Sequence, residues 1–277
     1  MSVNIFKRKE KYNGLLQIFL IALVQGITEF LPISSSGHLI LLPKIMDWVD
    51  QGLEIDIAVH VGTLLAVMLY FHKDVLVIIK GFFDLCLRKK SDGRNLFINL
   101  VVGTIPVVIV GVLIKALIEN EFRNATLIGV TSIIFGVLLY IADRKPDESS
   151  KDVVKMPLKD AFLIGLSQTI ALIPGVSRSG ITMTFARFLG YSRTHSAKFS
   201  LLLSMPTTFA ASVLILYEMS ETASDARIQD ALLSGITAFV IGFLAISIMM
   251  KWLKKFSFTP FVVYRVILGF IILAIVF

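Results

Sequence analysis

The chain is poor in charged residues and has a single cysteine. Only 17% of its 277 residues are Asp, Glu, Lys or Arg, whereas soluble domains carry about 25%. This composition excludes an ordinary soluble domain, and the lone Cys86 excludes an internal disulfide. The net charge of +7 does not indicate a nucleic acid partner, because the Lys and Arg residues gather between apolar runs. The positive-inside rule predicts them there.

Apolar runs take the place of charge, since 56% of the residues are hydrophobic. Several runs approach the ~20 residues that a spanning helix needs, while others are short or are interrupted by Pro and Gly. The runs lie at 15–33, 57–71, 96–118, 125–142, 161–176, 199–217, 231–250 and 261–277. The sequence therefore predicts an all-α integral membrane protein in which residues 1–277 form a single membrane domain.

The loops between these runs differ in charge. The segments 88–94, 144–159, 187–198 and 251–255 are rich in Lys and Arg, so we expect them in the cytoplasm. The segments 47–56, 119–124 and 218–230 are acidic or carry few basic residues, so we expect them outside. No small-x-small cleavage site follows the first apolar run, so we expect residues 1–26 to belong to the mature protein.

An internal repeat relates the two halves of the chain. A shift of 143 positions matches Gln25 with Gln168, Ser34 with Ser177, Ser36 with Ser179 and Gly37 with Gly180. Each matched cluster precedes three predicted spans, and an odd number of spans inverts the second half. We therefore predict six transmembrane helices plus two re-entrant helical hairpins in an inverted-topology repeat, with repeat one at about 12–142 and repeat two at about 156–277.

The first segment leaves an alternative open. A hairpin there places both chain ends outside, including the basic residues Lys7 to Lys11. A full crossing would instead give seven spans and a cytoplasmic amino terminus. We favour the hairpin because the string from Pro32 to Gly37 would break a spanning helix in the middle of the apolar phase.

The first polar cluster is QGITEFLPISSSGH, residues 25–38. Gln25 and Glu29 are four residues apart, so they share one face of a helix. A carboxylate in the membrane costs ~2.5 to 3.5 kcal/mol, and it is usually retained for ion binding, proton transfer or metal coordination. The alternative is a carboxylate that only pairs with a neighbouring serine or arginine.

Three serines follow in this cluster. Ser34, Ser35 and Ser36 precede Gly37 and look like a capped helix start, whose exposed N–H groups bind anions. His38 lies within reach of these hydroxyls on a helix, and hydroxyl, base and carboxylate are the parts of an activated nucleophile. Ordinary helix capping with a structural histidine is the alternative.

The second polar cluster is PGVSRSGIT, residues 174–182. It repeats the proline, glycine and serines of the first cluster but adds Arg178, whose planar fork of donors matches phosphate oxygens. A salt bridge to Glu29 or to another acid is the alternative role for this arginine. The two clusters together predict a phosphate site at the interface of the repeats. We expect His60 and His195 to be boundary residues, and Arg265 to pair internally.

These strings resemble the signatures of the undecaprenyl-diphosphate phosphatase family, the bacitracin-resistance type of bacterial membrane phosphatase. The likeness extends from about Tyr12 to Phe277 and includes DIAVHVGTLLAVMLYF and FVVYRVILG. The resemblance implies hydrolysis of undecaprenyl diphosphate to undecaprenyl phosphate and inorganic phosphate at the outer face of the bacterial cytoplasmic membrane. Such hydrolysis recycles the lipid carrier for peptidoglycan synthesis and confers bacitracin resistance.

The resemblance also implies roles for individual residues. Catalysis falls on Glu29, which handles metal or protons, on Ser35 and His38 as nucleophile and activator, and on Arg178 as diphosphate clamp. Either Ser35 or His38 could be the nucleophile. The substrate-binding set is Gln25, Ser34, Ser36, Gly37, Ser177, Ser179 and Thr182.

The same family implies a divalent metal, Mg or Ca, held by Glu29 and Gln25. Many members have Glu at the position of Gln25, so here only an amide oxygen joins the carboxylate. The metal geometry is therefore open.

Two other classes of membrane protein share parts of this pattern. A secondary transporter or lipid flippase would also use Arg178 and Glu29, but it does not need a serine and a histidine beside the phosphate. The phosphatidic-acid-type phosphatases are rejected, because Thr184 stands where that family has its histidine. The expected partners are undecaprenyl diphosphate and membrane lipid, with no nucleic acid, and the sequence leaves a homodimer open.

Overall fold

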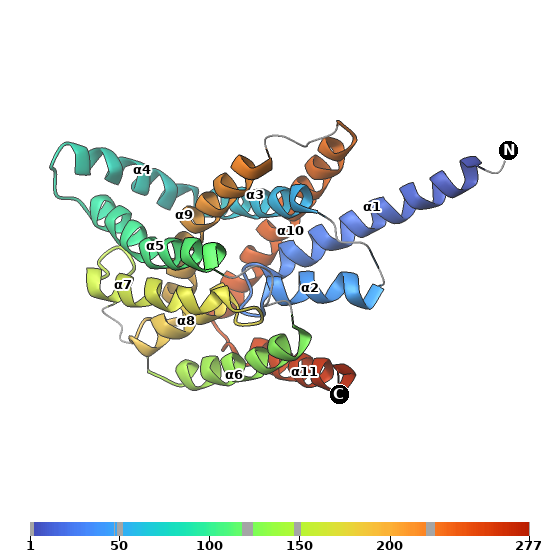
Figure 1. Cartoon of the computed structure of the whole chain (residues 1–277). Coiled ribbons are helices and arrows are strands. Elements are labelled where there is room, and N and C mark those ends of the chain that lie inside the picture. Colours follow the sequence, from blue (N-terminus) through green and yellow to red (C-terminus); the bar gives the residue numbers. More distant parts are fainter. Residues whose placement is uncertain are drawn as a thin grey trace.

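The computed structural model describes residues 3–46, 48, 52–117, 124–146, 151–219 and 225–276, which form helices and no strands. Figure 1 shows the arrangement of these helices. Their bounds are α1 Val3–Thr28, α2 Ser35–Met46, α3 Leu53–Tyr70, α4 His72–Cys86, α5 Asp92–Leu117, α6 Ala125–Asp143, α7 Leu158–Ser167, the 3-10 helix η1 Gln168–Leu172, α8 Arg178–Phe188, α9 Arg193–Met219, α10 Asp225–Leu253 and α11 Thr259–Val276.

Among the described residues, 4 helices are long and apolar enough to cross a membrane. They lie at Asp92–Ile114, Ala125–Asp143, Ile228–Leu253 and Thr259–Val276. Counting α3 and α4, which are bent by 90° at their junction, as one span raises the number to 5. The prediction of an all-α membrane protein with several spans is confirmed at this level. The six spans stay a prediction, because four or at most five candidate spans are found among the described residues.

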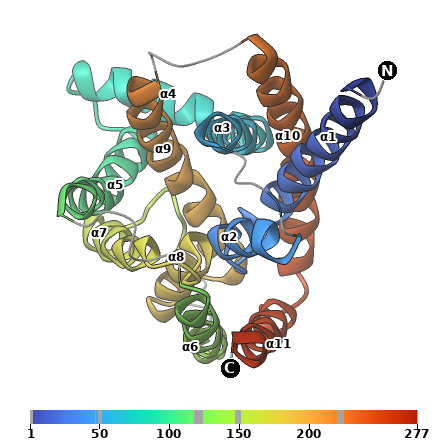
Figure 2. The same ribbon diagram turned by 45° about the vertical axis from the view of Figure 1, so that its right-hand side comes forward.

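Helices α2 and α8 lie in the middle of the bundle, and other helices surround them (Figure 2). They contain 12 and 11 residues, so each is about 18 Å long or less and cannot cross a ~30 Å hydrocarbon layer alone. Both begin at the polar clusters found in the sequence. Around them α1 packs on α10, α7 packs on α5, and α6 packs on α11.

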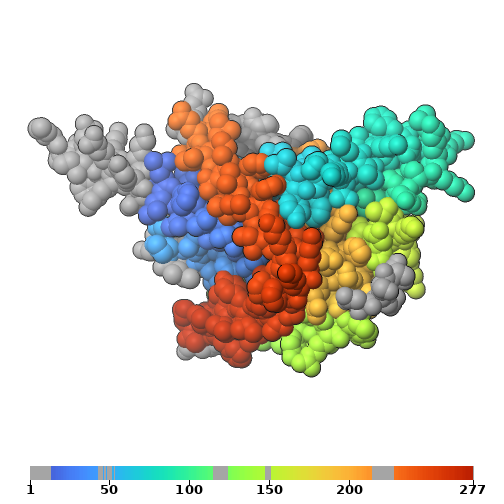
Figure 3. Space-filling view, turned by 180° about the vertical axis from the view of Figure 1, so that it is seen from behind, coloured from blue at the N-terminus to red at the C-terminus, as the bar shows by residue number. Residues whose placement is uncertain are grey.

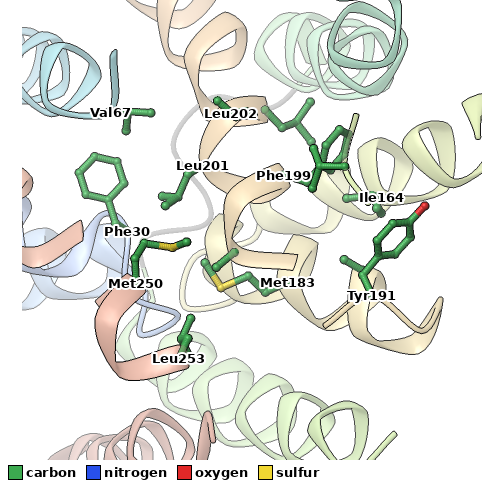
Figure 4. Packing of buried hydrophobic residues seen from close by; sticks show 14 of the residues in the cluster. Phe30, Val67, Ile164, Met183, Tyr191, Phe199, Leu201, Leu202, Met250 and Leu253 are labelled. Carbon is green, nitrogen blue, oxygen red and sulfur yellow. The ribbon is translucent and has the colours of Figure 1, made fainter. Parts of the chain in front are cut away.

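The turn after α1 is fixed by close packing. Phe30 is 1% exposed and belongs to a cluster with Val67 of α3, Leu201 of α9 and Met250 of α10 (Figure 4). Apolar burial alone contributes little inside a membrane, so van der Waals packing has to hold this side chain. Because Phe30 follows Glu29 directly, the cluster also fixes the backbone of the carboxylate.

The outer surface of the bundle is apolar. On α10 and α11, Ile236, Ile248, Phe270 and Ile275 are 61%, 67%, 61% and 73% exposed. Figure 3 shows these two helices, in orange to red, along one face of the molecule. Large apolar side chains exposed over whole helices are a liability in water, and they fit a face that meets lipid.

Candidate active site

Two serines in the left-handed region of φ begin the two central helices. Ser34 has φ 73° and Ser177 has φ 71°. The Ser34 hydroxyl accepts from Gly37 N at 3.4 Å, and the Ser177 hydroxyl accepts from Gly180 N at 3.1 Å. A non-glycine residue in this region costs of order 1–3 kcal/mol and usually marks a functional turn. The turns aim the starts of both helices at one place.

Glu29 is the centre of the polar network. It is 9% exposed, and its Oε2 accepts from Ser35 Oγ at 2.6 Å and from Gln25 Nε2 at 3.0 Å. Its Oε1 accepts from Arg178 Nη2 at 2.6 Å. The structure therefore forms the salt bridge to Glu29 that the sequence left as the alternative role for Arg178. It also brings residues of both sequence clusters into contact.

The guanidinium of Arg178 also reaches helix α9. Its Nη1 donates to Thr208 Oγ1 at 3.1 Å and to Ser204 O at 3.4 Å. Nineteen per cent of the side chain stays exposed, so the group is held firmly but remains open to a ligand. Arg178 is thus braced between the first polar cluster and α9.

A cavity of about 240 Å³ opens beside this network. The predicted residues on its wall are Glu29, Ser35, Ser36, Ser177 and Arg178. One carboxylate, one guanidinium and three hydroxyls therefore converge on a space that suits a small anionic group. Donors and a cation of this kind stabilise charge that develops on phosphate oxygens.

His38 lies apart from Ser35 in this arrangement. Its Nδ1 donates to Ser34 O at 2.7 Å, and its Nε2 accepts from the Tyr264 hydroxyl at 2.6 Å. The ring also stacks on Tyr264, with centroids 5.7 Å apart. In the structure the Ser35 hydroxyl therefore bonds Glu29 and not His38, and both ring nitrogens of His38 bond other partners.

The remaining predicted residues hold the two turns. Ser179 Oγ donates to Leu31 O at 2.9 Å, which ties the second turn to the first. Thr182 is 1% exposed, donates to Arg178 O at 2.8 Å and bonds Ser200 Oγ at 2.7 Å. These two hydroxyls lie behind the cavity wall and do not line the cavity.

Arg265 of α11 connects the two turns, a role that the sequence did not reveal. It is fully buried and donates to Pro32 O at 3.3 Å, Gly175 O at 3.0 Å and Val176 O at 2.8 Å. We expected internal pairing for this residue, and its partners are backbone carbonyls of both clusters. The sequence signal for such a role was the presence of an arginine inside an apolar span, where a charge needs partners.

Sequence reasoning also missed part of the cavity wall. His60, Thr207, Thr208 and Ser212 line the cavity, although we expected His60 to be a boundary residue. Thr208 and Ser212 are four residues apart on α9, so their shared face could have been found from spacing. Nothing in the sequence placed α3, which carries His60, against the first cluster.

Side-chain oxygens near Glu29 are of the kind that binds a hard divalent cation. The side-chain oxygen Oε1 of Gln25 is buried and has no hydrogen-bond partner among the described residues. No group of three His, Cys, Asp or Glu residues that could hold a metal lies in the part of the chain that the structure describes. Magnesium is often held by one or two protein oxygens, with water and substrate phosphates completing its shell. Gln25 and Glu29 supply oxygens of the required kind, although in this structure the Gln25 amide turns its nitrogen, and not its oxygen, to Glu29.

The chain is similar in sequence to proteins of one known family. Residues 18–271 match the family described as bacitracin resistance protein BacA. A protein of Roseobacter denitrificans named undecaprenyl-diphosphatase is 48% identical over 94% of this chain and 97% of its own length. Proteins of the same name from Hahella chejuensis and Campylobacter curvus are 46% and 45% identical, over 92% and 94% of this chain and 95% and 98% of their own lengths. The chain belongs to the BacA family.

Proposed function

We propose that this protein hydrolyses undecaprenyl diphosphate to undecaprenyl phosphate and inorganic phosphate, and that it thereby recycles the lipid carrier for cell-wall synthesis and confers bacitracin resistance. The relatives named undecaprenyl-diphosphatase support this activity. The observation that carries it is the hydrogen-bonded series Ser35–Glu29–Arg178 on the wall of a cavity in a membrane protein. This series unites a nucleophile, a base and a cation.

Ser35 is the nucleophile in the reaction that this geometry favours. Its oxygen attacks the terminal phosphorus while its proton passes to Glu29 over the 2.6 Å hydrogen bond. The bond from that phosphorus to the bridging oxygen breaks, and undecaprenyl phosphate leaves with the bonding electrons. Water then attacks the phosphorus of the phosphoserine, the bond to Ser35 Oγ breaks, Oγ takes back the proton held by Glu29, and the phosphate leaves with both protons of the water.

Arg178 stabilises the charge of this reaction. Before substrate binds, it neutralises Glu29 at 2.6 Å, and its exposed part faces the cavity. A planar guanidinium binds two phosphate oxygens at once. The starts of α2 and α8 add positive helix ends on the same side.

His38 acts in this proposal by shaping the turn. Its bond to Ser34 O supports the left-handed turn that presents Ser35. The alternative is His38 as nucleophile, which would give a phosphoimidazole. Acid treatment of a trapped phosphoenzyme separates the two, because phosphoserine survives acid and phosphohistidine does not.

A divalent metal, Mg or Ca, assists the reaction in our proposal. Glu29 and Gln25 would hold it, since the free Oε1 of Gln25 offers a hard oxygen ligand. Bound there, the metal would supply positive charge to the diphosphate. The site residues act as described above with or without this assignment.

We further propose the inverted-topology repeat of six spans and two re-entrant hairpins, with repeats at about 12–142 and 156–277. The packing between the two halves supports it, because the first helix of each half packs on a helix of the other half. Helix α1 of the first half packs on α10, and α7 of the second half packs on α5. The matching left-handed serines Ser34 and Ser177 support it as well. With the basic loops in the cytoplasm of a bacterium, the cavity is reached from the outer face.

Phosphate release from undecaprenyl diphosphate by purified protein in detergent tests the function. We expect release by the wild type and not by Ser35→Ala. Thermal unfolding transitions should show that both proteins are folded. No release by a folded wild type that binds the lipid would instead favour the transporter or flippase class.

A further inference from the structure

A second polar cavity lies at the other end of α8 from the candidate active site. Its volume is about 690 Å³, and it is formed where α6 and α8 end and where α9 and α11 begin. Arg178 begins α8 at the first cavity, and Arg187 lines the second. Arg187 lies nine positions after Arg178, which is about 14 Å along the axis of α8.

The second cavity is strongly basic. Among the residues that the structure describes, its wall carries Arg144, Lys145, Arg187 and Arg193 and one carboxylate, Asp143, which gives these residues a net charge of +3. The starts of α9 and α11 add positive helix ends to the same space. A cavity of this charge attracts an anion.

Two of the four cations are fixed by Asp143 and form the inner wall. Arg193 Nε donates to Asp143 Oδ1 at 2.6 Å, and the fully buried Arg187 lies 3.7 Å from the same oxygen. Arg144 and Lys145 are exposed at the mouth. The guanidinium carbon of Arg144 lies 4.5 Å from the centroid of the Tyr140 ring, and the group also donates to the Tyr140 hydroxyl. Arg144 is therefore held in place before any ligand arrives.

The mouth of this cavity lies at the level where a membrane begins. The candidate spans Ala125–Asp143 and Thr259–Val276 end and begin there, respectively, and α6 and α11 lie side by side (Figure 2). Ile134, Val137 and Ile141 are 54%, 44% and 52% exposed on α6. Their spacing of three and four continues to Arg144, so the apolar stripe and this cation share one face of the helix.

We propose that this cavity binds the phosphate of an anionic phospholipid headgroup. An acyl chain along the Ile134–Ile141 stripe places the headgroup at Arg144 and Lys145. Basic pockets between spans on the cytoplasmic side recognise anionic lipids in this way. The proposal goes beyond the proposed hydrolysis and does not depend on it.

The test is a titration of purified protein in detergent with short-chain phosphatidylglycerol, followed by native mass spectrometry and by the thermal unfolding midpoint. Phosphatidylcholine and inorganic phosphate are titrated in parallel. The cavity variant is Arg144→Gln with Lys145→Gln. The control variant is Lys254→Gln with Lys255→Gln, which removes equal charge from exposed residues between α10 and α11 that do not line the cavity.

We expect saturable phosphatidylglycerol binding by the wild type that weakens roughly 30-fold in the cavity variant, since each cation contributes about a factor of five. The control variant should bind like the wild type, and phosphatidylcholine should bind weakly. Equal weakening in both variants would overturn the proposal in favour of diffuse surface charge. Binding of inorganic phosphate as tight as that of phosphatidylglycerol would assign the cavity to a soluble anion instead.

Discussion

Glu29 and Arg178 are 149 residues apart in the chain, and they form a 2.6 Å ion pair at the wall of the central cavity. The pair joins two helix starts that the sequence marks separately as polar clusters. Neither charge could remain in an apolar phase at low cost without the other. The ion pair is therefore both a structural link between the two halves of the chain and the charged part of the site.

Arg178→Gln should lower kcat/KM for undecaprenyl diphosphate by about 10²- to 10³-fold, the usual cost of losing one donor that stabilises developing charge. Steady-state phosphate release measures this. Arg88→Gln removes the same charge from an exposed residue and should leave kcat/KM unchanged. Equal activity of wild type and Arg178→Gln would rule out the clamp.

Ser35→Ala should abolish phosphate release and phosphoenzyme formation, because the hydroxyl bonded to Glu29 is the proposed nucleophile. Ser36 lines the same cavity without bonding to Glu29, so Ser36→Ala should keep most of the activity. Rapid quenching with labelled substrate measures the phosphoenzyme. Label on the Ser35→Ala protein would show that another residue is the nucleophile. His38 would be the first candidate.

Arg265→Met should lower the thermal unfolding midpoint and the activity together. The change leaves the carbonyls of Pro32, Gly175 and Val176 without their donor, at about 1–3 kcal/mol for each unsatisfied group. Circular dichroism in detergent and phosphate release measure the two effects. The exposed Lys251→Met is the matched control. Full activity in Arg265→Met would show that the turns hold without it.

Ser177→Ala should be less stable than Ser177→Gly, although alanine is closer in size to serine. Both lose the cap on Gly180 N, but glycine accepts the φ of 71° without strain. The difference should be about 1 kcal/mol. Thermal unfolding of the two variants measures it, and the opposite order would contradict the left-handed geometry.

Gln25→Glu should lower the concentration of Mg²⁺ that gives half-maximal activity, by roughly tenfold, because a second carboxylate raises the charge of the proposed ligand set. Activity after EDTA treatment and Mg²⁺ titration measures this in both proteins. Insensitivity to EDTA in both would remove the metal from the proposal. Gln25→Asn, which keeps an amide on a shorter side chain, is the control for side-chain size.

The sequence alone determined the class of molecule and most of the site. Low charge and long apolar runs require a helical membrane protein, because backbone groups in lipid must be satisfied within each helix. Glu29 and Arg178 stand out for the same reason, since a charge in an apolar phase has to have a partner or a task. The serine and glycine strings also marked both helix starts, and the family followed from those strings.

Only the tertiary structure decided which partners those residues take. In the structure Ser35 bonds Glu29 and His38 bonds Tyr264. Arg265 bonds the backbone of both turns. Spacing along one helix reports which side chains share a face, but it cannot report which distant helix packs against that face. The chemistry of this protein was therefore visible in its residue types, while the assignment of partners depended on how α3, α9 and α11 pack around the two central helices.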